Sequence, residues 1–307
     1  MAHTVSWELH RSFLGVLKEG SLSAAARALD LSQPTVGRHV AALEAALGLV
    51  LFTRSQSGLL PTEAALALRG YAEAMHSTAA ALERAAQSQG EGVQGAVRIS
   101  ASEVIGVEVL PPIVAALQQA HPRLQIELVL TNRVQDLLRR EADIAVRMTP
   151  PKHAQLIARR VGDVLLGLHA HPSYLARCGT PRTLAELAQH ALIGYDEETP
   201  FIRAARAALP GWTRQAFTLR TDSDVAQLAL IRAGAGIGIC QVALAQREPA
   251  LVRLLPRQAE LKLETWVTMH EDLRHSPRCK ASFDALVQGL SAYLQRRPAS
   301  AGALSRS

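Results

Sequence analysis

The stretch from Ser21 to Gly48 reads SLSAAARALDLSQPTVGRHVAALEAALG and holds the signals that decide the fold of the first part of the chain. Serines at its start can cap a short alanine-rich helix, which Asp30 then breaks. Ser32 can cap a second helix, and Pro34 is tolerated in its first turn because the amides there have no intrahelical partner. The stretch therefore predicts two helices joined by a tight turn.

The neighbouring sequence extends this pair of helices on both sides. In the second helix the apolar residues recur at helical spacing, and Gly48 ends the pattern. Before the pair, residues 7–19 carry apolar side chains on one helical face and are followed by Gly20, a helix C-terminal signal. After the pair, residues 49–52 and 59–60 predict two strands around a polar turn, which together make a wing.

A long helix is predicted after the wing. No proline occurs between Thr62 and about Gln89, and the apolar residues there approach a heptad repeat. An apolar seam of this kind is too narrow for a buried helix and suits a partner helix. The residues expected at a dimer interface are Leu68, Tyr71, Met75 and Leu82.

The second helix of the pair presents polar side chains opposite its apolar face. Gln33 and Arg38 can make bidentate contacts to adenine and guanine, while Thr35 can contact a thymine methyl group or a phosphate. Arg54 in the wing is placed for a phosphate or for the minor groove. The expected DNA-binding residues are Ser32, Gln33, Pro34, Thr35, Arg38, His39 and Arg54. The alternative is a small helical domain that binds another protein.

The charge of the chain is compatible with a nucleic-acid partner, but its distribution is uneven. The whole chain of 307 residues carries a net charge of +6. Residues 1–66 hold five lysines and arginines and five aspartates and glutamates, so their net charge is zero. DNA binding by this part must therefore depend on individually placed residues, because bulk charge contributes little there.

These features, in this order, resemble the winged helix-turn-helix of the LysR-type transcriptional regulators. The residues that carry the resemblance are Ala24–Leu29, Leu31–His39 and Ala42–Glu44. It implies a DNA-binding transcriptional regulator, not an enzyme, that acts as a homodimer or homotetramer on an inverted-repeat operator, and it implies that the long helix is the linker through which two subunits pair. Gly37 stands where the family often has serine, and no second arginine follows Arg54 in the wing.

Beyond Gly95 predicted strands alternate with predicted helices, including one at 134–141, which indicates parallel βαβ units in an α/β region large enough for two lobes. The expected strands are 97–100, 125–130, 144–148, 164–169, 192–195, 215–219, 236–240 and 265–269. The expected domains are 1–61 for the winged helix-turn-helix, 62–91 for the linker helix and 92–298 for the α/β domain, followed by a flexible tail at 299–307. Within the α/β domain, one lobe holds about 92–165 and 269–298, and the other about 166–268.

Four short motifs of the α/β region are similar, in order and spacing, to the effector-binding domain of the same family. They are Leu110-Pro111, His121-Pro122, Asp143–Arg147 and Gly234–Gly238. The resemblance implies the fold of periplasmic binding proteins, with two Rossmann-like lobes and a small-molecule effector between them. The alternative is a solute-binding protein or an enzyme on the same α/β fold with a fused helical interaction domain.

Ligands of open α/β sheets bind beyond the carboxyl ends of the strands, where helix N-termini offer unpaired amides. Hydroxyl groups beside such amides suit a carboxylate or another small anion, so an anionic effector is expected. The candidate effector-binding residues at these positions are Ser100, Ser102, Thr131, Asn132, Arg147, Asp222 and Ser223. For any single serine or threonine in this set, an ordinary helix cap is an equally good interpretation.

Several classes of protein and site are disfavoured. The longest apolar runs fall short of a membrane span, and the first residues lack a basic segment followed by an apolar one, so a cytoplasmic protein without membrane contact is expected. Three widely spaced cysteines predict neither a metal site nor a disulfide pair. The Gly234–Gly238 motif lacks the third glycine of a dinucleotide fingerprint, and no catalytic triad order occurs. No cofactor is expected.

Overall fold

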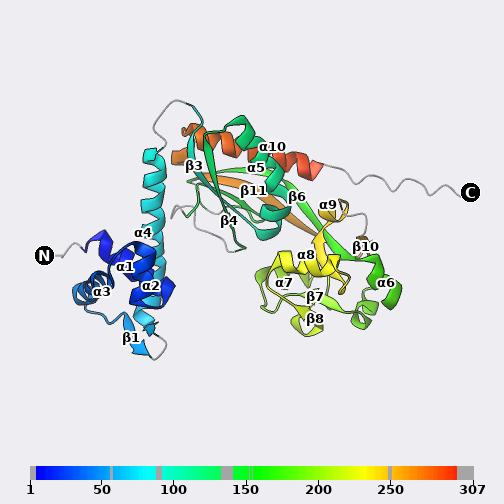
Figure 1. Ribbon diagram of the computed structural model, residues 1–307. Coiled ribbons are helices and arrows are strands. Elements are labelled where there is room, and N and C mark those ends of the chain that lie inside the picture. The colour runs from blue at the N-terminus through cyan, green and yellow to red at the C-terminus, as the bar shows by residue number, and fades with distance from the viewer. Residues whose placement is uncertain are drawn as a thin grey trace, which may run out of the picture. The chain divides into compact units, whose positions relative to one another are not determined.

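The computed structural model describes residues 5–55, 58–87, 92–132, 141–151, 153, 155–247 and 251–295. These residues form two compact units, of which the first holds the chain up to Ala86 and the second most of the chain from Gln87 onward. Figure 1 shows the helical first unit in blue and cyan and the mixed α/β second unit mostly in green to red. The expected tail at 299–307 and nearly all of the expected helix at 134–141 lie outside the described residues.

The described part of the first unit contains a helix-turn-helix, a two-stranded wing and a long helix. Its elements are α1 (Trp7–Glu19), α2 (Leu22–Leu29), α3 (Gln33–Leu47), β1 (Phe52–Ser55), β2 (Gly58–Pro61) and α4 (Glu63–Gln87). Ser32 Oγ accepts a hydrogen bond from the amide of Thr35 at 3.3 Å, and Ser21 caps α2 in the same way. Gly48 ends α3 with φ +66°, a conformation that glycine adopts easily. The predicted caps are confirmed.

The core of the first unit joins the three short helices to the start of α4. Its fully or nearly fully buried side chains include Phe13, Leu14, Leu43, Leu51, Ala65 and Ala72 in one cluster and Val16, Ala25, Ala26, Val36 and Val40 in a second. Leu68 of α4 packs against the first cluster. The apolar faces predicted for α1 and α3 therefore build one small domain onto which the first turns of α4 are docked.

The first strand of the wing lies three residues later than the sequence predicts. The predicted strand at 49–52 is wrong: the ladder begins at Phe52, where β1 pairs antiparallel with β2. The reason lies in Glu44 of α3, whose Oε1 accepts hydrogen bonds from the amides of Leu51 at 2.7 Å and Phe52 at 3.3 Å. These bonds hold the segment before β1 against the helix and out of the sheet, with Leu51 fully buried.

The substitution Glu44→Ala is expected to destabilise the first unit by about 1–3 kcal/mol, because it leaves two amides beside a buried leucine without their acceptor. Calorimetry of the full-length protein should show the transition of this unit at a lower temperature, with faster hydrogen exchange at Leu51 and Phe52. Glu63→Ala, which removes an exposed glutamate of α4, is the matched control. Equal exchange rates in both variants would contradict this role of Glu44.

The second unit contains a large mixed sheet and a smaller parallel one. The large sheet holds β3 (Gly95–Ala101), β4 (Leu124–Leu130), β5 (Ile144–Arg147), β6 (Leu156–Ala170), β9 (Gly238–Gln241), β10 (Val252–Leu254) and β11 (Glu260–His270). Its order is β10-β6-β11-β5-β3-β4, with β9 also paired to β6. The small sheet pairs β7 (Leu192–Gly194) with β8 (Phe217–Arg220).

The prediction of purely parallel units is wrong for half of the large sheet. Strands β3, β4 and β5 are parallel, but β11 runs antiparallel to both β5 and β6. Strand β6 also begins at Leu156, well before the predicted start at 164. The sequence did not reveal its first half, because that half is partly exposed and carries charged residues such as Arg159 and Arg160. A strand with one solvent-exposed face lacks the continuous apolar run from which buried strands are predicted.

Strands β6 and β11 pair along their length and run through both lobes of the second unit. Leu166 belongs to the larger core cluster, which contains β3 and β5, and Leu168 of the same strand belongs to a second cluster. The β6–β11 register shifts at a bulge between Thr265 and Trp266, inside the larger cluster. Gly162, which faces Thr265 there, has φ +140°, a backbone conformation that other residues rarely adopt.

Helical segments cover the sheets. They are η1 (Ile105–Val109), α5 (Leu110–Ala120), α6 (Pro172–Cys178), η3 (Ala185–Gln189), α7 (Pro200–Ala205), η4 (Arg214–Ala216), α8 (Asp224–Arg232), α9 (Val242–Ala245), η5 (Glu271–Leu273) and α10 (Pro277–Gln295). Helices α5 and α10 pack together beside the large sheet (Figure 1). The segment 105–120 begins with a π-helical turn, because Pro111 and Pro112 have no amide hydrogen to continue an α-helical ladder. None of the described helices is long and apolar enough to cross a membrane.

Candidate DNA-binding and effector sites

The first turns of α3 present a polar surface. Gln33, Pro34 and Arg38 are exposed, whereas Val36 and Val40 on the other side of the helix are buried. Arg38 Nη2 donates a hydrogen bond of 3.4 Å to the side-chain oxygen of Thr35, and this bond is its one side-chain hydrogen bond to the described residues. A long, exposed guanidinium with so weak an internal contact is free to reach a base edge.

The other predicted DNA-binding residues differ in their exposure and in the hydrogen bonds that they make within the first unit. Ser32 Oγ lies 2.7 Å from Thr35 Oγ1 as part of the helix cap, and Arg54 is exposed on β1. His39 faces the core instead: its Nδ1 lies 2.8 Å from Oγ of the fully buried Ser12 in α1. His39 therefore anchors α3 to α1, and at most its other ring nitrogen can contact DNA.

Helix α4 carries an exposed apolar groove of about 700 Å³. Its lining residues are Trp7, Tyr71, Ala74, Met75, Thr78, Ala79 and Leu82. Tyr71 and Leu82 are 68% and 70% exposed, which is unusual for side chains of this size. The expected seam needs one correction, because Leu68 packs against the core of the first unit and does not line the groove.

Trp7 is a groove residue that the seam pattern of α4 alone could not reveal. It comes from the start of α1, and its ring stacks on His76 with centroids 6.3 Å apart. The signal in the sequence was a large aromatic side chain at the very beginning of the first helix, outside the apolar face of that helix. Trp7 thus widens the apolar surface that α4 exposes.

In the second unit, candidate effector residues of the first lobe gather at the carboxyl ends of β3 and β4. The amide of Thr131 donates to the carbonyl of Ala101 at 2.9 Å, and Asn132 Oδ1 accepts from the amide of Glu103 at 3.2 Å. Ser102 lies in the same turn, half-buried. The parallel strands therefore bring these predicted residues to one edge of the sheet, as their topology requires.

Ser100 and Arg147 form an internal pair beside that edge. Arg147 Nη2 donates to Ser100 Oγ at 2.7 Å, and its Nη1 donates to the carbonyl of Val146 at 2.8 Å. Ser100 is fully buried, so its hydroxyl group serves Arg147. Its full burial, and not the bond from Arg147, is what opposes a direct contact between Ser100 and an effector.

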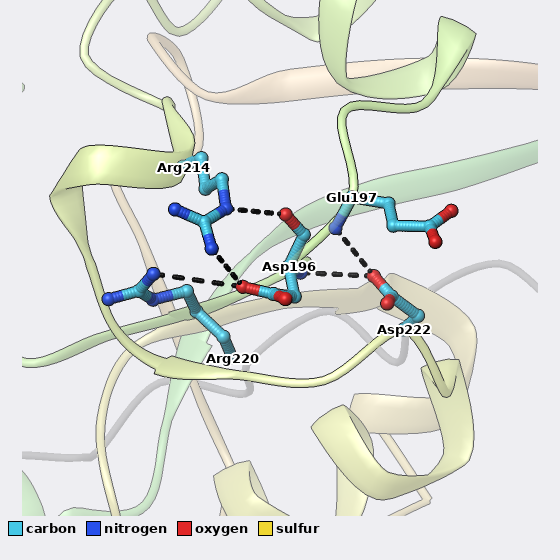
Figure 2. A network of polar contacts seen from close by, with 5 residues as sticks. All are labelled: Asp196, Glu197, Arg214, Arg220 and Asp222. Atoms are coloured by element: carbon cyan, nitrogen blue, oxygen red, sulfur yellow. Dashed lines mark hydrogen bonds and ion pairs between the residues drawn. The ribbon is translucent and has the colours of Figure 1, made fainter.

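Asp222 of the second lobe holds a loop in place, as Figure 2 shows. Its Oδ1 accepts hydrogen bonds from the amides of Asp196 at 3.0 Å and Glu197 at 2.9 Å. Arg214 adds two bonds of 2.7 Å to the carbonyl and the carboxylate of Asp196, and Arg220 lies 3.7 Å from the same carboxylate. The predicted effector role of Asp222 is thereby weakened, because one of its oxygens is committed to the loop after β7.

Direct hydrogen bonds join the two lobes beside this loop. Ser223 Oγ donates to Glu103 Oε2 at 2.9 Å, and Asn132 Nδ2 donates to Asp224 Oδ2 at 2.9 Å. The hydroxyl group of Tyr195 also donates to Asp224. Burial raises the pKa of Asp224, and the nearby charge of Glu103 raises it further, while the bonds from Tyr195 and Asn132 act in the opposite direction.

Tyr195 and Asp224 were not among the predicted effector residues. Tyr195 was the last residue of a predicted strand, so the rule that places ligands at carboxyl ends of strands could have found it. Asp224 is the first residue of α8, and the rule for strand ends does not point to it. Their contacts show that the place where these bonds join the lobes, called the cleft below, carries carboxylates from both lobes, Glu103 and Asp224, besides the predicted hydroxyl groups.

A second set of contacts joins η1 to α8. Arg232 Nη1 and Nη2 lie 2.7 and 3.1 Å from the two carboxylate oxygens of Glu108, which lowers the pKa of Glu108 mainly through these bonds. Arg247 donates to the carbonyl of Glu108 at 3.1 Å and lies over the ring of Tyr293. Among the described residues, no group of three His, Cys, Asp or Glu side chains is arranged to hold a metal ion.

Comparisons with known proteins agree on one family. The family model "LysR substrate binding domain" matches residues 90–291, and the model "Bacterial regulatory helix-turn-helix protein, lysR family" matches residues 7–66. An HTH-type transcriptional regulator of Xanthomonas campestris is 33% identical over 181 residues, 58% of this chain and 52% of the relative, so the match spans about half of that relative's length. PtxR of Pseudomonas aeruginosa, another HTH-type transcriptional regulator, is 31% identical over 262 residues, 80% of each protein.

A solved structure extends the match to nearly the whole chain. CrgA of Neisseria meningitidis, described as a LysR-type transcriptional regulator, is 27% identical, with a TM-score of 0.59 over 92% of this chain and 98% of that one. The predicted fold class, a winged helix-turn-helix, a linker helix and a two-lobed α/β effector-binding domain, is confirmed by these matches. Because the substrate-binding-domain model covers most of the chain, the protein belongs to the LysR family of transcriptional regulators and is not an enzyme.

Proposed function

We propose that the protein binds an inverted-repeat operator as a dimer or tetramer. The affinity for that operator, or the bending of its DNA, changes when a small molecule binds between the lobes of the second unit. The observation that carries the proposal is the exposed polar face at the start of α3, with Arg38 and Gln33 displayed opposite a buried apolar face. Recognition helices meet base edges through such N-terminal turns, and Arg54, exposed on the wing, can contact a phosphate or the minor groove.

The exposed groove of α4 supports assembly from two copies. A helix-turn-helix of this size reads only a half-site, so two copies held at fixed spacing are needed for an inverted repeat. Tyr71, Met75 and Leu82 together leave a large apolar surface in water, and a second copy of the same groove would bury it symmetrically. The operator and the dimer are thus proposed on separate surfaces of the first unit.

For the effector we propose an anionic group held at the carboxyl ends of β3 and β4. Ser102 and Thr131 supply hydroxyl groups there, and Arg147 supplies a positive charge on the neighbouring strand β5. Glu103 follows Ser102 directly and Asp224 is bonded to Asn132, so two carboxylates lie beside these hydroxyl groups and suit hydrogen-bond donors of the ligand. An effector with a carboxylate directed at Arg147 and donor groups directed at Glu103 and Asp224 fits this arrangement.

The proposed function is tested by footprinting the DNA that flanks the gene of this protein, with the purified full-length protein and with or without candidate metabolites. Two protected half-sites separated by about one helical turn, or a multiple of it, are expected. An added effector should change the extent of protection or the pattern of bending, since its coupling energy is typically about 1–3 kcal/mol. Absence of any protected site on flanking DNA and on a random-sequence library would refute the operator proposal.

The double variant Ser102→Ala, Thr131→Val is expected to weaken the binding of an anionic effector by roughly 10-fold or more, since it removes two hydroxyl groups at the proposed anion site. Calorimetry of the full-length protein against carboxylic acids, amino acids and aromatic acids provides the measurement. Thr218→Val, an exposed threonine on β8, serves as the control. Unchanged affinity in the double variant would place the ligand elsewhere.

A further inference from the structure

A pocket of about 340 Å³ opens in the second lobe, separate from the residues of the cleft. It is lined by Leu184, Ala185, Leu187, Ala188, Leu192, Leu209, Pro210, Gly211, Trp212 and Ala216. These residues come from η3, from the start of β7 and from the turn that leads through η4 to β8. Separate segments of chain therefore converge on one space.

The position of the pocket sets it apart from the proposed effector site. Leu192 begins β7 and Ala216 directly precedes β8, so the pocket lies at the amino ends of these two parallel strands. Tyr195 and Asp222, which contact or support the cleft edge, follow the carboxyl ends of the same strands. Strands of this length span roughly 10–13 Å, which is the separation expected between the two places.

The chemistry of the lining selects against charged ligands. None of the ten lining residues has a charged side chain, and the indole N–H of Trp212 is the only hydrogen-bonding group on their side chains. A charged ligand would lose its hydration here without gaining a partner. The inner wall of the pocket is tightly packed, because Leu192, Leu209 and Trp212 are only 2–3% exposed. The Trp212 ring packs edge-on against the ring of Phe217, with the ring centroids 5.1 Å apart.

Small residues at the rim keep the space open. Ala185, Ala188 and Gly211 are exposed, and a Cβ atom placed on Gly211 would find no other atom within 4 Å. Apolar cavities of about 150 Å³ already take up benzene, so a space of 340 Å³ can hold a molecule of two fused rings. Apolar walls, this volume and the tightly packed Trp212 ring together favour a flat, uncharged ring system.

We propose that this pocket is a second ligand site, which binds an uncharged molecule of one or two aromatic rings. A ligand there contacts the segments that lead into β7 and β8 and so acts on the loops that carry Tyr195 and Asp222. The site goes beyond the proposed response to an anionic effector in the cleft, and the two sites are distinguished by the charge of the ligands that they accept.

The test is a titration of 5-fluoroindole with the full-length protein, followed by fluorine NMR. Saturable binding with a dissociation constant on the order of 0.1–1 mM is expected for a ligand of this size. Unlabelled indole should displace it and benzoate should not. Two variants that fill the pocket from different sides, Ala216→Leu and Ala188→Phe, should each weaken binding by at least about 10-fold, whereas Ala204→Phe, at an exposed alanine of α7 outside the lining, should not.

Circular dichroism of each variant checks that the fold is retained, and either pocket variant that folds decides the result. The proposal is overturned if binding does not saturate, if a folded pocket variant binds as tightly as the wild type, or if Ala204→Phe weakens binding equally. Displacement by benzoate at the same concentrations as indole would also overturn it, since the probe would then occupy an anion site.

Discussion

The substitution Arg38→Ala is expected to weaken binding to the operator by roughly 5- to 150-fold, equivalent to about 1–3 kcal/mol for the loss of one bidentate base contact. The side chain is exposed on α3 and makes a single 3.4 Å side-chain hydrogen bond to the described residues, so its removal should leave the fold unchanged. Binding to nonspecific DNA should fall much less, because base contacts are absent there.

Fluorescence anisotropy with operator and nonspecific duplexes at one fixed salt concentration measures this effect. The matched control is Arg69→Ala, which removes an exposed arginine of the same unit whose surface pair with Glu73 lies on α4. Salt should weaken binding of the control and the wild type with the same slope. Wild-type operator affinity in Arg38→Ala would show that α3 does not read the groove as proposed.

The second large effect is expected from Tyr71→Glu combined with Leu82→Glu, which should convert the proposed dimer to monomers at micromolar concentration. Both side chains line the groove of α4 and are about 70% exposed in the single chain, so neither substitution disturbs a core. In a symmetric pair each charge is buried twice, without a partner. Operator binding should fall with dissociation, because the half-sites are no longer linked.

Sedimentation velocity decides this prediction, with Leu66→Glu as the control. Leu66 is an exposed leucine of the same helix, 53% exposed, but it does not line the groove. Leu68→Glu is unsuitable, because Leu68 packs on the domain core and its loss would confuse unfolding with dissociation. A double variant that sediments as the wild type does would exclude the groove as the main interface.

Local signals in the sequence predicted the helical part of the fold well. Ser32 and Gly48 act within one turn of the residues that they cap, so their effect can be predicted from neighbouring residues alone. The wing strand was misplaced because Glu44 bonds to amides seven and eight residues away, a contact that no local pattern reveals. The strand predicted at 164–169 was shorter than β6, because the solvent-exposed first half of β6 lacks an apolar run.

In the candidate sites, too, the sequence predicted features that depend on neighbouring residues and missed those that depend on distant contacts. The exposed face of α3 followed from helical periodicity and is present in the structure, whereas its role in DNA binding stays a prediction that the proposed experiments address. The bonds from Ser223 to Glu103 and from Asn132 to Asp224 join residues 120 and 92 positions apart, so only the tertiary fold brings them together. The rule for strand ends predicted residues that the structure brings to one edge of the sheet, but it could not tell that Asp222 serves a loop.

The pairing of β6 with β11 through both lobes limits how an effector can move them. Sliding one lobe past the other would break many ladder hydrogen bonds at once, whereas twisting a sheet changes each of them only slightly. The bulge beside Thr265 and the unusual backbone of Gly162 mark the point where the ladder is already interrupted. Any movement of one lobe against the other is therefore expected as a twist of this ladder, small in angle but amplified by distance at the far ends of the lobes.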